Sequence, residues 1–459
     1  MDLTPLSVFI PSEYGGKGAN TYEALRMLEV SSYQSLALSL MMGINGALFL
    51  QPIANYGNKK VAREIFRRFM EEKAMGGLMI TEPDYGSDAL RMQTCYQYDE
   101  ETGKYRIQGT KHWAGLTGEA DYWLISARKE CKGGNLGRDI SFFIHDSRNG
   151  GIDVEELFPN LGLYMLPYGL NEIDIQVDED YKLQPKSIGV KMMLDILHRS
   201  RLQFPGMAMG FLRRLLDESI AHCKERLVGG KSLTTYDQVK HRLVVLQSYF
   251  TVCSGMCHFT GDNVPLNKDT SGMDLEANTI KALVTDLMQR ASHSLLQLTG
   301  AKGYRLDHIA GSAFVDSRPF QIFEGSNDIL FQQITESVLK AMRKVDVFNL
   351  SEFLQDFRLS EQASDYLDDV VNFTIDPQMS QRKQVKLGRA LSRIFSMEFV
   401  LRMGNKGFNS KLIDNAVDTM ISEINGIICS FESASLADVV SEYESESSWI
   451  DYLSNNGNG

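Results

Sequence analysis

The chain has 459 residues, enough for two to four domains and a large buried core. Its 43% hydrophobic and 23% charged residues are typical of an ordinary soluble globular protein. The formal net charge of -12 argues against a nucleic-acid-binding protein and against a surface that binds acidic lipid.

Six cysteines are scattered without regular spacing, which indicates a reducing compartment. Cys253, Cys257 and His258 form the one cluster, and two cysteines on one helix face make zinc conceivable. No second ligand pair lies nearby, so we expect buried small side chains and no metal. No signal segment follows Met1, so we expect a cytoplasmic location in a bacterium or a mitochondrial-matrix location in a eukaryote.

Residues 22–74 carry apolar residues three and four positions apart, which predicts a helical domain over residues 1–75. The apolar run 36–50 contains Ser39, Gly43 and Asn45. It is too short and too interrupted to span a bilayer, and we interpret it as a buried helix.

From Gly76 the period changes to that of short strands. We expect strands at 78–80, 96–98, 105–107, 122–125, 141–144 and 171–177, with a hairpin turn at 99–103. Residues 76–188 are therefore predicted to form a small central β domain, either a barrel or a sandwich.

Helical periodicity returns after Gly189. We expect long helices at 190–226, 236–259, 275–299 and 327–345, which predict a four-helix bundle over residues 189–345. Residues 346–459 are expected to form a helical extension, with helices at 350–357, 380–403 and 411–431 and a frayed acidic tail from Ser441. Within it, residues 393–403 are partly amphipathic, which favours a face buried against the bundle over a membrane contact.

The most informative segment places one carboxylate, Glu324, between Phe323 and Gly325, just ahead of a predicted helix. Poor solvation there would raise its pKa and make it a usable base near neutral pH. Ser326 or Asn327 is expected to cap the helix, whose free N–H groups favour an anion such as phosphate. The alternative is an ordinary capped helix with an incidental acid.

Three further segments are ambiguous when each is read alone. Residues 81–88 follow a strand and could bring backbone N–H groups to a polar ligand, or simply form a turn. Trp113 could stack on a planar cofactor, although the tryptophan by itself favours a core position. The small residues in 297–304 fit a helix C-terminus or a close approach by another subunit.

Taken in order, these segments resemble the acyl-CoA dehydrogenase family. The motifs are the turn at 10–18, Thr81-Glu82-Pro83 with Gly86-Ser87-Asp88, Gly109 with Lys111 and Trp113, Arg201 with Gly210, residues 297–304, and Phe323 to Ile329. The resemblance covers residues 5–345, and the extension is similar to that of very-long-chain members. It implies a mostly helical α+β fold with an N-terminal helical domain, a central β-barrel domain and a C-terminal four-helix bundle.

The resemblance implies FAD between the β domain and the bundle. The implied cofactor contacts are Leu78, Ile80, Thr81, Gly86, Ser87, Trp113, Gly115, Ser326 and Asp328, and, toward the cofactor of a neighbouring subunit, Arg226, Gln238, Gln297, Gly300 and Ala301. A homodimer or tetramer is therefore expected. Electrons would pass to an electron-transfer flavoprotein.

Glu324 matches the family's catalytic base, which removes the α-proton of an acyl-CoA while the β-hydride goes to flavin N5. The implied substrate contacts are Ser87, Arg201, Phe323 and Gly325. Some members carry the base just before the arginine matched by Arg201, but Ser200 stands there, which leaves Glu324 as the candidate. An oxidase that uses O₂, or a scaffold protein on the same fold, are the alternatives.

The chain departs from the family pattern at several positions. Gly115 replaces a residue whose hydroxyl reaches the flavin, and Thr117 is a candidate substitute. Ala301 interrupts a run of glycines, and Leu227 replaces an aromatic residue. The first two helices of the family's N-terminal domain are expected to be missing from the chain as given.

Overall fold

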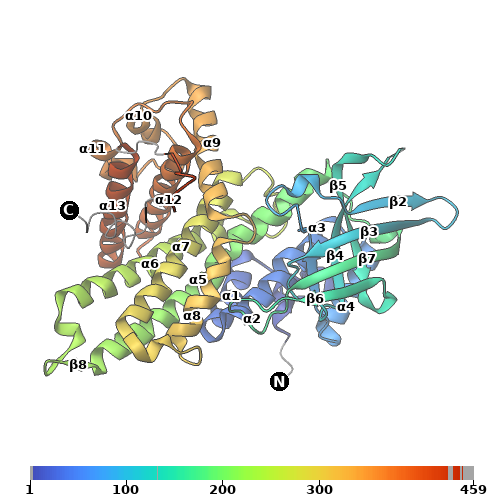
Figure 1. Cartoon of the computed structure of the whole chain (residues 1–459), viewed down its shortest axis with the longest axis horizontal. Helices are drawn as coiled ribbons and strands as arrows, with labels where there is room; N and C mark the ends of the chain where they lie inside the picture. Colours follow the sequence, from blue (N-terminus) through green and yellow to red (C-terminus); the bar gives the residue numbers. More distant parts are fainter. Residues whose placement is uncertain (1–3, 132, 433–437, 445–446, 448–459) are drawn as a thin grey trace, which may run out of the picture.

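The computed structural model describes residues 4–131, 133–432, 438–444 and 447. Figure 1 shows a curled sheet flanked by the N-terminal helices, a long helix bundle beside it, and a second helical layer at the far side of the bundle. The N-terminal helices are α1 (Thr21–Gln34), α2 (Leu36–Gly43), α3 (Gln51–Tyr56) and α4 (Lys59–Glu71). The predicted mostly helical α+β fold is confirmed.

A π-helical stretch, Ile44–Leu50, joins α2 to α3 and makes one apolar helical run. Within the described ranges, Leu36–Tyr56 is the one helical run long and apolar enough to cross a membrane. However, 78% of its most apolar 18-residue stretch is buried inside the protein. It packs against the first strand, where Asn45 Oδ1 accepts a hydrogen bond from the Gly76 N–H at 2.7 Å. The predicted buried helix is confirmed.

The sheet has seven strands in the order β1-β4-β2-β3-β7-β6, with β5 also paired to β4. The strands are β1 (Gly76–Met79), β2 (Cys95–Asp99), β3 (Lys104–His112), β4 (Tyr122–Glu130), β5 (Leu136–Asp146), β6 (Ile152–Leu157) and β7 (Gly169–Asp178). The predicted hairpin is the antiparallel β2–β3 pair. β6 was not predicted, because five of its six residues are exposed and it lacks a buried face.

Four of the bundle helices were predicted, with ends that agree within a few residues. The bundle contains α5 (Gly189–Glu225), α6 (Asp237–Asn263), α7 (Asp274–Thr299), α8 (Ile309–Ser317) and α9 (Asn327–Val345), with the two-residue strands β8 (Leu227–Val228) and β9 (Lys231–Ser232) at one end. The prediction missed α8, which is only nine residues long. Cys253 is buried in α6 and its thiol donates to the Pro205 carbonyl.

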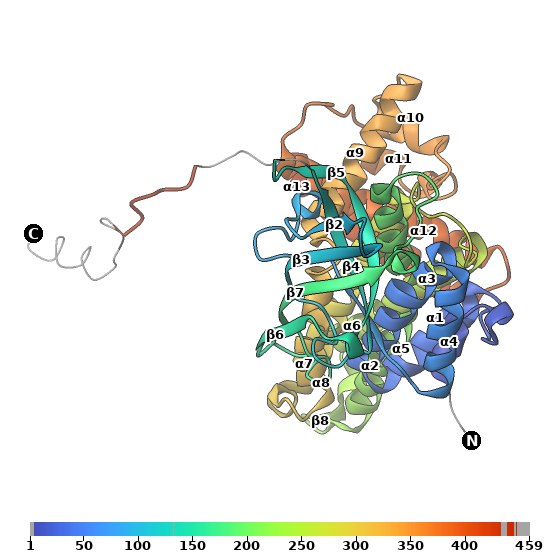
Figure 2. The same cartoon turned by 90° about the vertical axis from the view of Figure 1, so that its right-hand side faces the viewer.

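The extension supplies α10 (Leu350–Gln355), α11 (Asp368–Val371), α12 (Gln381–Gly404) and α13 (Ser410–Glu432). α12 packs on α6, α7 and α9, and α13 covers α12 and α6 (Figures 1 and 2). Arg393 of α12 is buried and paired with Glu423 of α13 at 2.7 Å. The predicted buried face of residues 393–403 is confirmed, whereas most of the predicted frayed tail lies outside the described residues.

Gly210 should be required for the close contact between α1 and α5. A Cβ at Gly210 would lie 1.9 Å from the Glu29 carbonyl oxygen, so Gly210→Ala must push the two helices apart. We expect this change to lower the free energy of unfolding by about 1–3 kcal/mol. Gly426 in α13 has open space around it, so Gly426→Ala should leave stability unchanged or raise it by up to about 1 kcal/mol. Urea denaturation of both variants tests this, and equal losses would contradict it.

Candidate active site

Residues 318–326 connect α8 to α9 and carry Glu324, and we call them the base loop after the predicted role of Glu324. Glu324 has a φ of 53° and Gly325 a φ of 93°, so two consecutive residues adopt the left-handed conformation. The conformation is unfavourable for a glutamate by about 1–2 kcal/mol. Within the described ranges, the Glu324 N–H donates to no protein acceptor. The turn therefore presents a carboxylate and a free amide from the same residue.

The Glu324 carboxylate is desolvated and only partly hydrogen-bonded. Ser200 Oγ donates to Oε1 at 2.8 Å, while Oε2 is buried and has no partner in the described part of the chain. Burial raises the pKa of Glu324, against the opposing effects of the Ser200 hydrogen bond and of the nearby Arg201 and Lys281 charges. The prediction of a poorly solvated acid is confirmed.

Aromatic side chains from both the bundle and the sheet surround this carboxylate. On the bundle side, the Phe323 ring lies 4.9 Å from that of Phe320 and 6.1 Å from that of Phe204. On the sheet side, burial and then the charge of Glu324 raise the pKa of Tyr168. These rings keep water from the acid and provide an apolar surface beside it.

Trp113 follows β3 and has a φ of 55°. Its ring contacts Phe158 at 4.5 Å and Tyr168 at 6.1 Å, yet 52% of the residue is exposed. The interpretation of Trp113 as a core residue is therefore wrong, because the left-handed turn directs the indole out of the sheet. A large flat ring left open beside Tyr168 suits a planar ligand.

Two buried cations hold the base loop by its main chain. Arg201 Nε donates to the Glu324 carbonyl at 3.0 Å, and Arg201 Nη1 donates to Asn278 at 2.8 Å. Lys281 Nζ donates to the Gly325 carbonyl at 2.7 Å, and burial lowers the lysine pKa to about 7. Arg201, predicted as a substrate contact, thus lies behind the loop. Sequence reasoning missed Lys281, although a lysine within the apolar run 280–284 was a signal.

A buried ion pair fixes the loop at the end of β1. Lys111 is fully buried, and its Nζ donates to Glu82 Oε1 and to the Ile80 carbonyl, both at 2.9 Å. Glu82 also accepts from the N–H groups of Gln93 and Thr94. Burial lowers the pKa of Lys111 to about 8, while Glu82 acts in the opposite direction. This pair, which sequence reasoning did not anticipate, shapes residues 80–94 and so positions Thr81 and its neighbours.

Three predicted contact residues carry free hydroxyls. In the residues that the structure describes, the hydroxyls of Thr81, Ser87 and Ser326 make no hydrogen bond to the protein. Ser326 stands at the N-cap position of α9, but its side chain makes no capping bond, so that part of the prediction is wrong. The first N–H groups of a 19-residue helix are therefore open to an anion. Asp328, in the same turn, pairs instead with Arg389 of α12 at 2.8 Å.

The position of Gly115, where the hydroxyl is missing, is crowded. A Cβ at Gly115 would lie 2.7 Å from Ile44 Cδ1, so a larger residue there requires the Ile44 side chain to shift. Thr117 does not replace the hydroxyl, because it is buried, donates to the Ala114 carbonyl at 2.8 Å and accepts from Asn171. The proposed substitution by Thr117 is wrong.

The residues predicted to meet a neighbouring subunit's cofactor lie elsewhere. Arg226, Gln238, Gln297, Gly300 and Ala301 are all exposed near the β8 end of the bundle (Figure 1). The last three help to line a shallow pocket of about 300 Å³. Arg226 follows Arg201 by 25 residues along α5, which corresponds to roughly 37 Å of helix. These side chains therefore do not share one site with Glu324 in a single chain.

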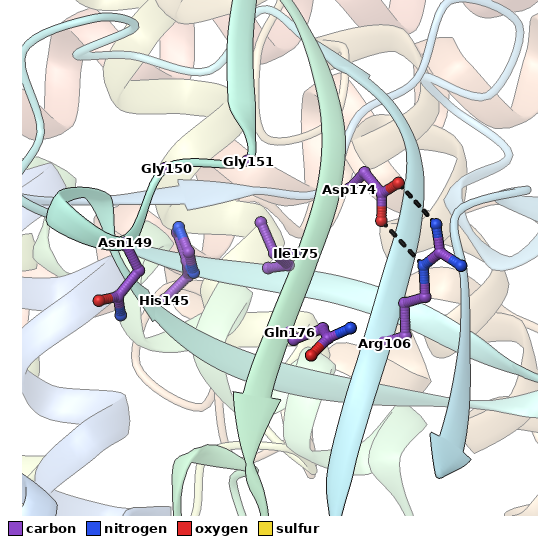
Figure 3. Close-up of a pocket in the computed structure, with 8 residues that line it drawn as sticks. All are labelled: Arg106, His145, Asn149, Gly150, Gly151, Asp174, Ile175 and Gln176. Carbon is purple, nitrogen blue, oxygen red and sulfur yellow. Dashed lines mark hydrogen bonds and ion pairs between the residues drawn. The ribbon is translucent and has the colours of Figure 1, made fainter. Parts of the chain in front are cut away.

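A different concavity, of about 500 Å³, lies on the β domain and is drawn in Figure 3. Arg106 and Asp174 on its rim form a bidentate ion pair at 2.7 and 3.0 Å, and His145 is buried at its edge. None of its lining residues is a predicted site residue. Because its charged groups neutralise one another, it is a weaker candidate than the region around Glu324.

A helical domain, a curled sheet and a helix bundle that meet at a buried carboxylate define a class of flavin-dependent dehydrogenases. Sequence models of the acyl-CoA dehydrogenase N-terminal, middle and C-terminal domains match residues 2–73, 77–175 and 188–339. The chain belongs to the acyl-CoA dehydrogenase family.

Two curated relatives and one solved structure illustrate the similarity. The very long-chain specific acyl-CoA dehydrogenase of Mus musculus is 23% identical over 72% of this chain and 50% of that protein, so the chain spans about half of that relative. The acyl-CoA dehydrogenase of Bacillus subtilis is 23% identical over 71% of this chain and 84% of that protein. The FAD complex of an acyl-CoA dehydrogenase from Bacillus anthracis aligns with a TM-score of 0.78 at 18% identity, over 93% of this chain and 80% of that one.

The cofactor of this family is FAD, and the residues around Glu324 and Trp113 fit it. The open Trp113 ring suits a flat ring system, and the free hydroxyls of Thr81 and Ser87 are available for polar contacts. The uncapped start of α9 at Ser326 suits a phosphate. These residues would hold the cofactor against the Glu324 side of the bundle.

Ser200 should lower the pKa of Glu324 through its hydrogen bond. A bond to a charged group contributes about 1.5–3 kcal/mol, so Ser200→Ala should raise this pKa further. The infrared carboxyl band that Glu324→Gln removes can be followed during a pH titration, and its midpoint should move to higher pH. Ser219 is a buried serine of the same helix whose hydroxyl has no partner in the described part of the chain. Ser219→Ala should not move the midpoint.

The Lys111–Glu82 pair should be needed for stability. Lys111→Met leaves Glu82 buried without its cation, and we expect a loss of about 3–5 kcal/mol in the free energy of unfolding. Lys104, on the same strand, pairs with Asp178 at the surface, so Lys104→Met should change stability by less than about 1 kcal/mol. Guanidinium denaturation compares the two variants, and similar losses would refute this assignment.

Proposed function

We propose that this protein oxidises an acyl-CoA thioester to the trans-2-enoyl-CoA with bound FAD, and that Glu324 is the base that removes the α-proton. The observation that supports this most strongly is the buried carboxylate with one unpartnered oxygen, presented together with the free N–H of the same residue. A raised pKa keeps such an acid reactive toward a weakly acidic C–H group.

The chemistry requires charge stabilisation as well as a base. As the α-proton leaves, negative charge develops on the thioester oxygen, and a preorganised N–H donor lowers the barrier by roughly 3 kcal/mol. The free Glu324 amide is the donor that the loop supplies. Bound FAD supplies the acceptor for the hydride from the β-carbon. The aromatic side chains at Phe323 and Tyr168 exclude water, which strengthens these interactions.

The remaining predicted contacts take separate roles in this proposal. Ser87 and Gly325 line the substrate side, Phe323 provides apolar surface, and Arg201 positions the loop through the Glu324 carbonyl. Electrons then leave to an electron-transfer flavoprotein, in fatty acid β-oxidation. The exposed residues near the β8 end support a homo-oligomer in which each copy reaches the cofactor of another.

Removing the base should abolish turnover while the cofactor stays bound. Glu324→Gln keeps the shape of the side chain but cannot accept the α-proton, so anaerobic bleaching of the flavin by acyl-CoA should slow by at least about 10³-fold. The flavin content and absorbance maxima should be unchanged. Glu336→Gln alters an exposed acid of α9 and should bleach at the normal rate. A fully active Glu324→Gln variant would remove this residue from the mechanism.

The electron acceptor distinguishes a dehydrogenase from an oxidase. A dehydrogenase should reoxidise rapidly with an electron-transfer flavoprotein and release little peroxide in air. Stoichiometric peroxide without that partner would instead establish an acyl-CoA oxidase. A panel of short-, medium- and long-chain acyl-CoA thioesters, followed by bleaching, would identify the substrate.

A further inference from the structure

The C-terminal extension contacts the helix that follows the base loop. α12 crosses the first half of α9 so closely that a Cβ at Gly388 would lie 1.9 Å from the Phe331 carbonyl oxygen (Figure 1). The next residue, Arg389, donates from Nη2 to Asp328 at 2.8 Å, and its guanidinium lies 4.7 Å from the Phe331 ring centre. The extension therefore reaches the first turn of α9 with a charged group.

Arg389 also forms an ion pair with a buried acid of the bundle. Its Nη1 lies 3.5 Å from Asp286 Oδ2 on α7, and Asp286 is only 6% exposed. In the part of the chain that the structure describes, no other cation lies within ion-pair distance of Asp286. Since a buried carboxylate is costly without a cation, the contact with Arg389 stabilises Asp286 in this place.

Asp286 in turn holds both sides of the base loop. Its Oδ1 accepts from Gln321 Nε2 at 2.7 Å and from Asn327 Nδ2 at 2.8 Å. Gln321 lies three residues before Glu324, and Asn327 lies three residues after it. One carboxylate oxygen thus fixes the separation of the two ends of the turn that carries the base.

The same hydrogen-bond network continues to Gly325, the residue next to the base. Asn327 Oδ1 accepts from Lys281 Nζ at 3.0 Å, and Lys281 Nζ also donates to the Gly325 carbonyl at 2.7 Å. Lys281 is fully buried, and no carboxylate lies within ion-pair distance of it in the described segments. The lysine is therefore oriented by the Asn327 amide, which Asp286 orients.

We propose that Arg389 of the extension is a positioning residue for Glu324, acting through Asp286 on both ends of the base loop. This inference rests on the proposed function, in which Glu324 is the base, and it gives the extension a role in the active site. A misplacement of about 1 Å in a reacting group can cost about 10²-fold in rate. Arg389 does not touch the Glu324 carboxylate. Besides Asp286 it contacts Asp328 and Phe331 at the start of α9, so the experiment must separate these two routes.

Arg389→Gln should loosen the base loop and slow the reaction. We expect faster hydrogen exchange in peptides covering residues 318–330, and a fall of about 10- to 100-fold in the rate of flavin reduction with little change in KM. Arg402 is the matched control, because it lies on the same helix with a similar exposed fraction, 40% against 38%, and pairs with Glu398 away from the loop. Arg402→Gln should change neither quantity. If Arg389→Gln behaves like this control, the proposal is overturned.

A double-mutant cycle shows whether Arg389 acts through Asp286. In an Asp286→Asn background, Arg389→Gln should slow flavin reduction much less than it does alone, because the pathway is already broken. Independent, additive losses would overturn the proposal. Should Arg389→Gln fold poorly, Arg389→Lys keeps the charge and should give an intermediate rate and exchange. If the wild-type protein is not bleached by any acyl-CoA, the proposed function fails, while the exchange measurement still decides the link between Arg389 and the loop.

Discussion

The burial of one half-partnered carboxylate is the constraint on which the active site depends. Leaving Glu324 Oε2 buried without a partner costs about 1–3 kcal/mol, and its left-handed backbone adds about 1–2 kcal/mol. The fold tolerates both costs because the base loop is held from several sides. Strain that surrounding structure maintains in this way is characteristic of functional sites. The same strain frees the Glu324 amide, so one unfavourable turn provides two groups for chemistry.

The two buried cations stabilise the loop without neutralising the base. Arg201 and Lys281 both donate to main-chain carbonyls, at Glu324 and at Gly325, and neither forms an ion pair with the carboxylate within the described ranges. A direct ion pair would lower the pKa of the acid by about 1–3 units and weaken it as a base. Because Arg201 and Lys281 bind the main chain and not the carboxylate, their charges lower the pKa of Glu324 by less than burial raises it. The extension contributes to this arrangement through Asp286, so the outermost helical layer is connected to the loop that carries Glu324.

Local sequence predicted the elements and the desolvated acid, and failed where distant residues meet. The helix ends at Asn327 and Val345 and the identity of Glu324 as a desolvated acid follow from periodicity and from immediate neighbours. The Lys111–Glu82 pair joins residues 29 positions apart. A lysine in a strand is expected at the surface unless its partner is known. Arg389 and Asp286 lie still further apart in the chain. Their contact depends on the packing of α12 against α9, which no local pattern encodes.

The glycine at position 115 shows how the N-terminal helices constrain one of the predicted cofactor contacts. Ile44 begins the π-helical stretch that presents Asn45 to the first N–H of β1, so the position of Ile44 is tied to the start of the sheet. Its Cδ1 fills the space that a side chain at Gly115 would need, and Tyr168 Cε1 would lie 3.5 Å from such a Cβ. A side chain with a hydroxyl at position 115 would therefore require Ile44 to move. Thr117 donates its own hydroxyl to the Ala114 carbonyl, so it supplies no compensating donor.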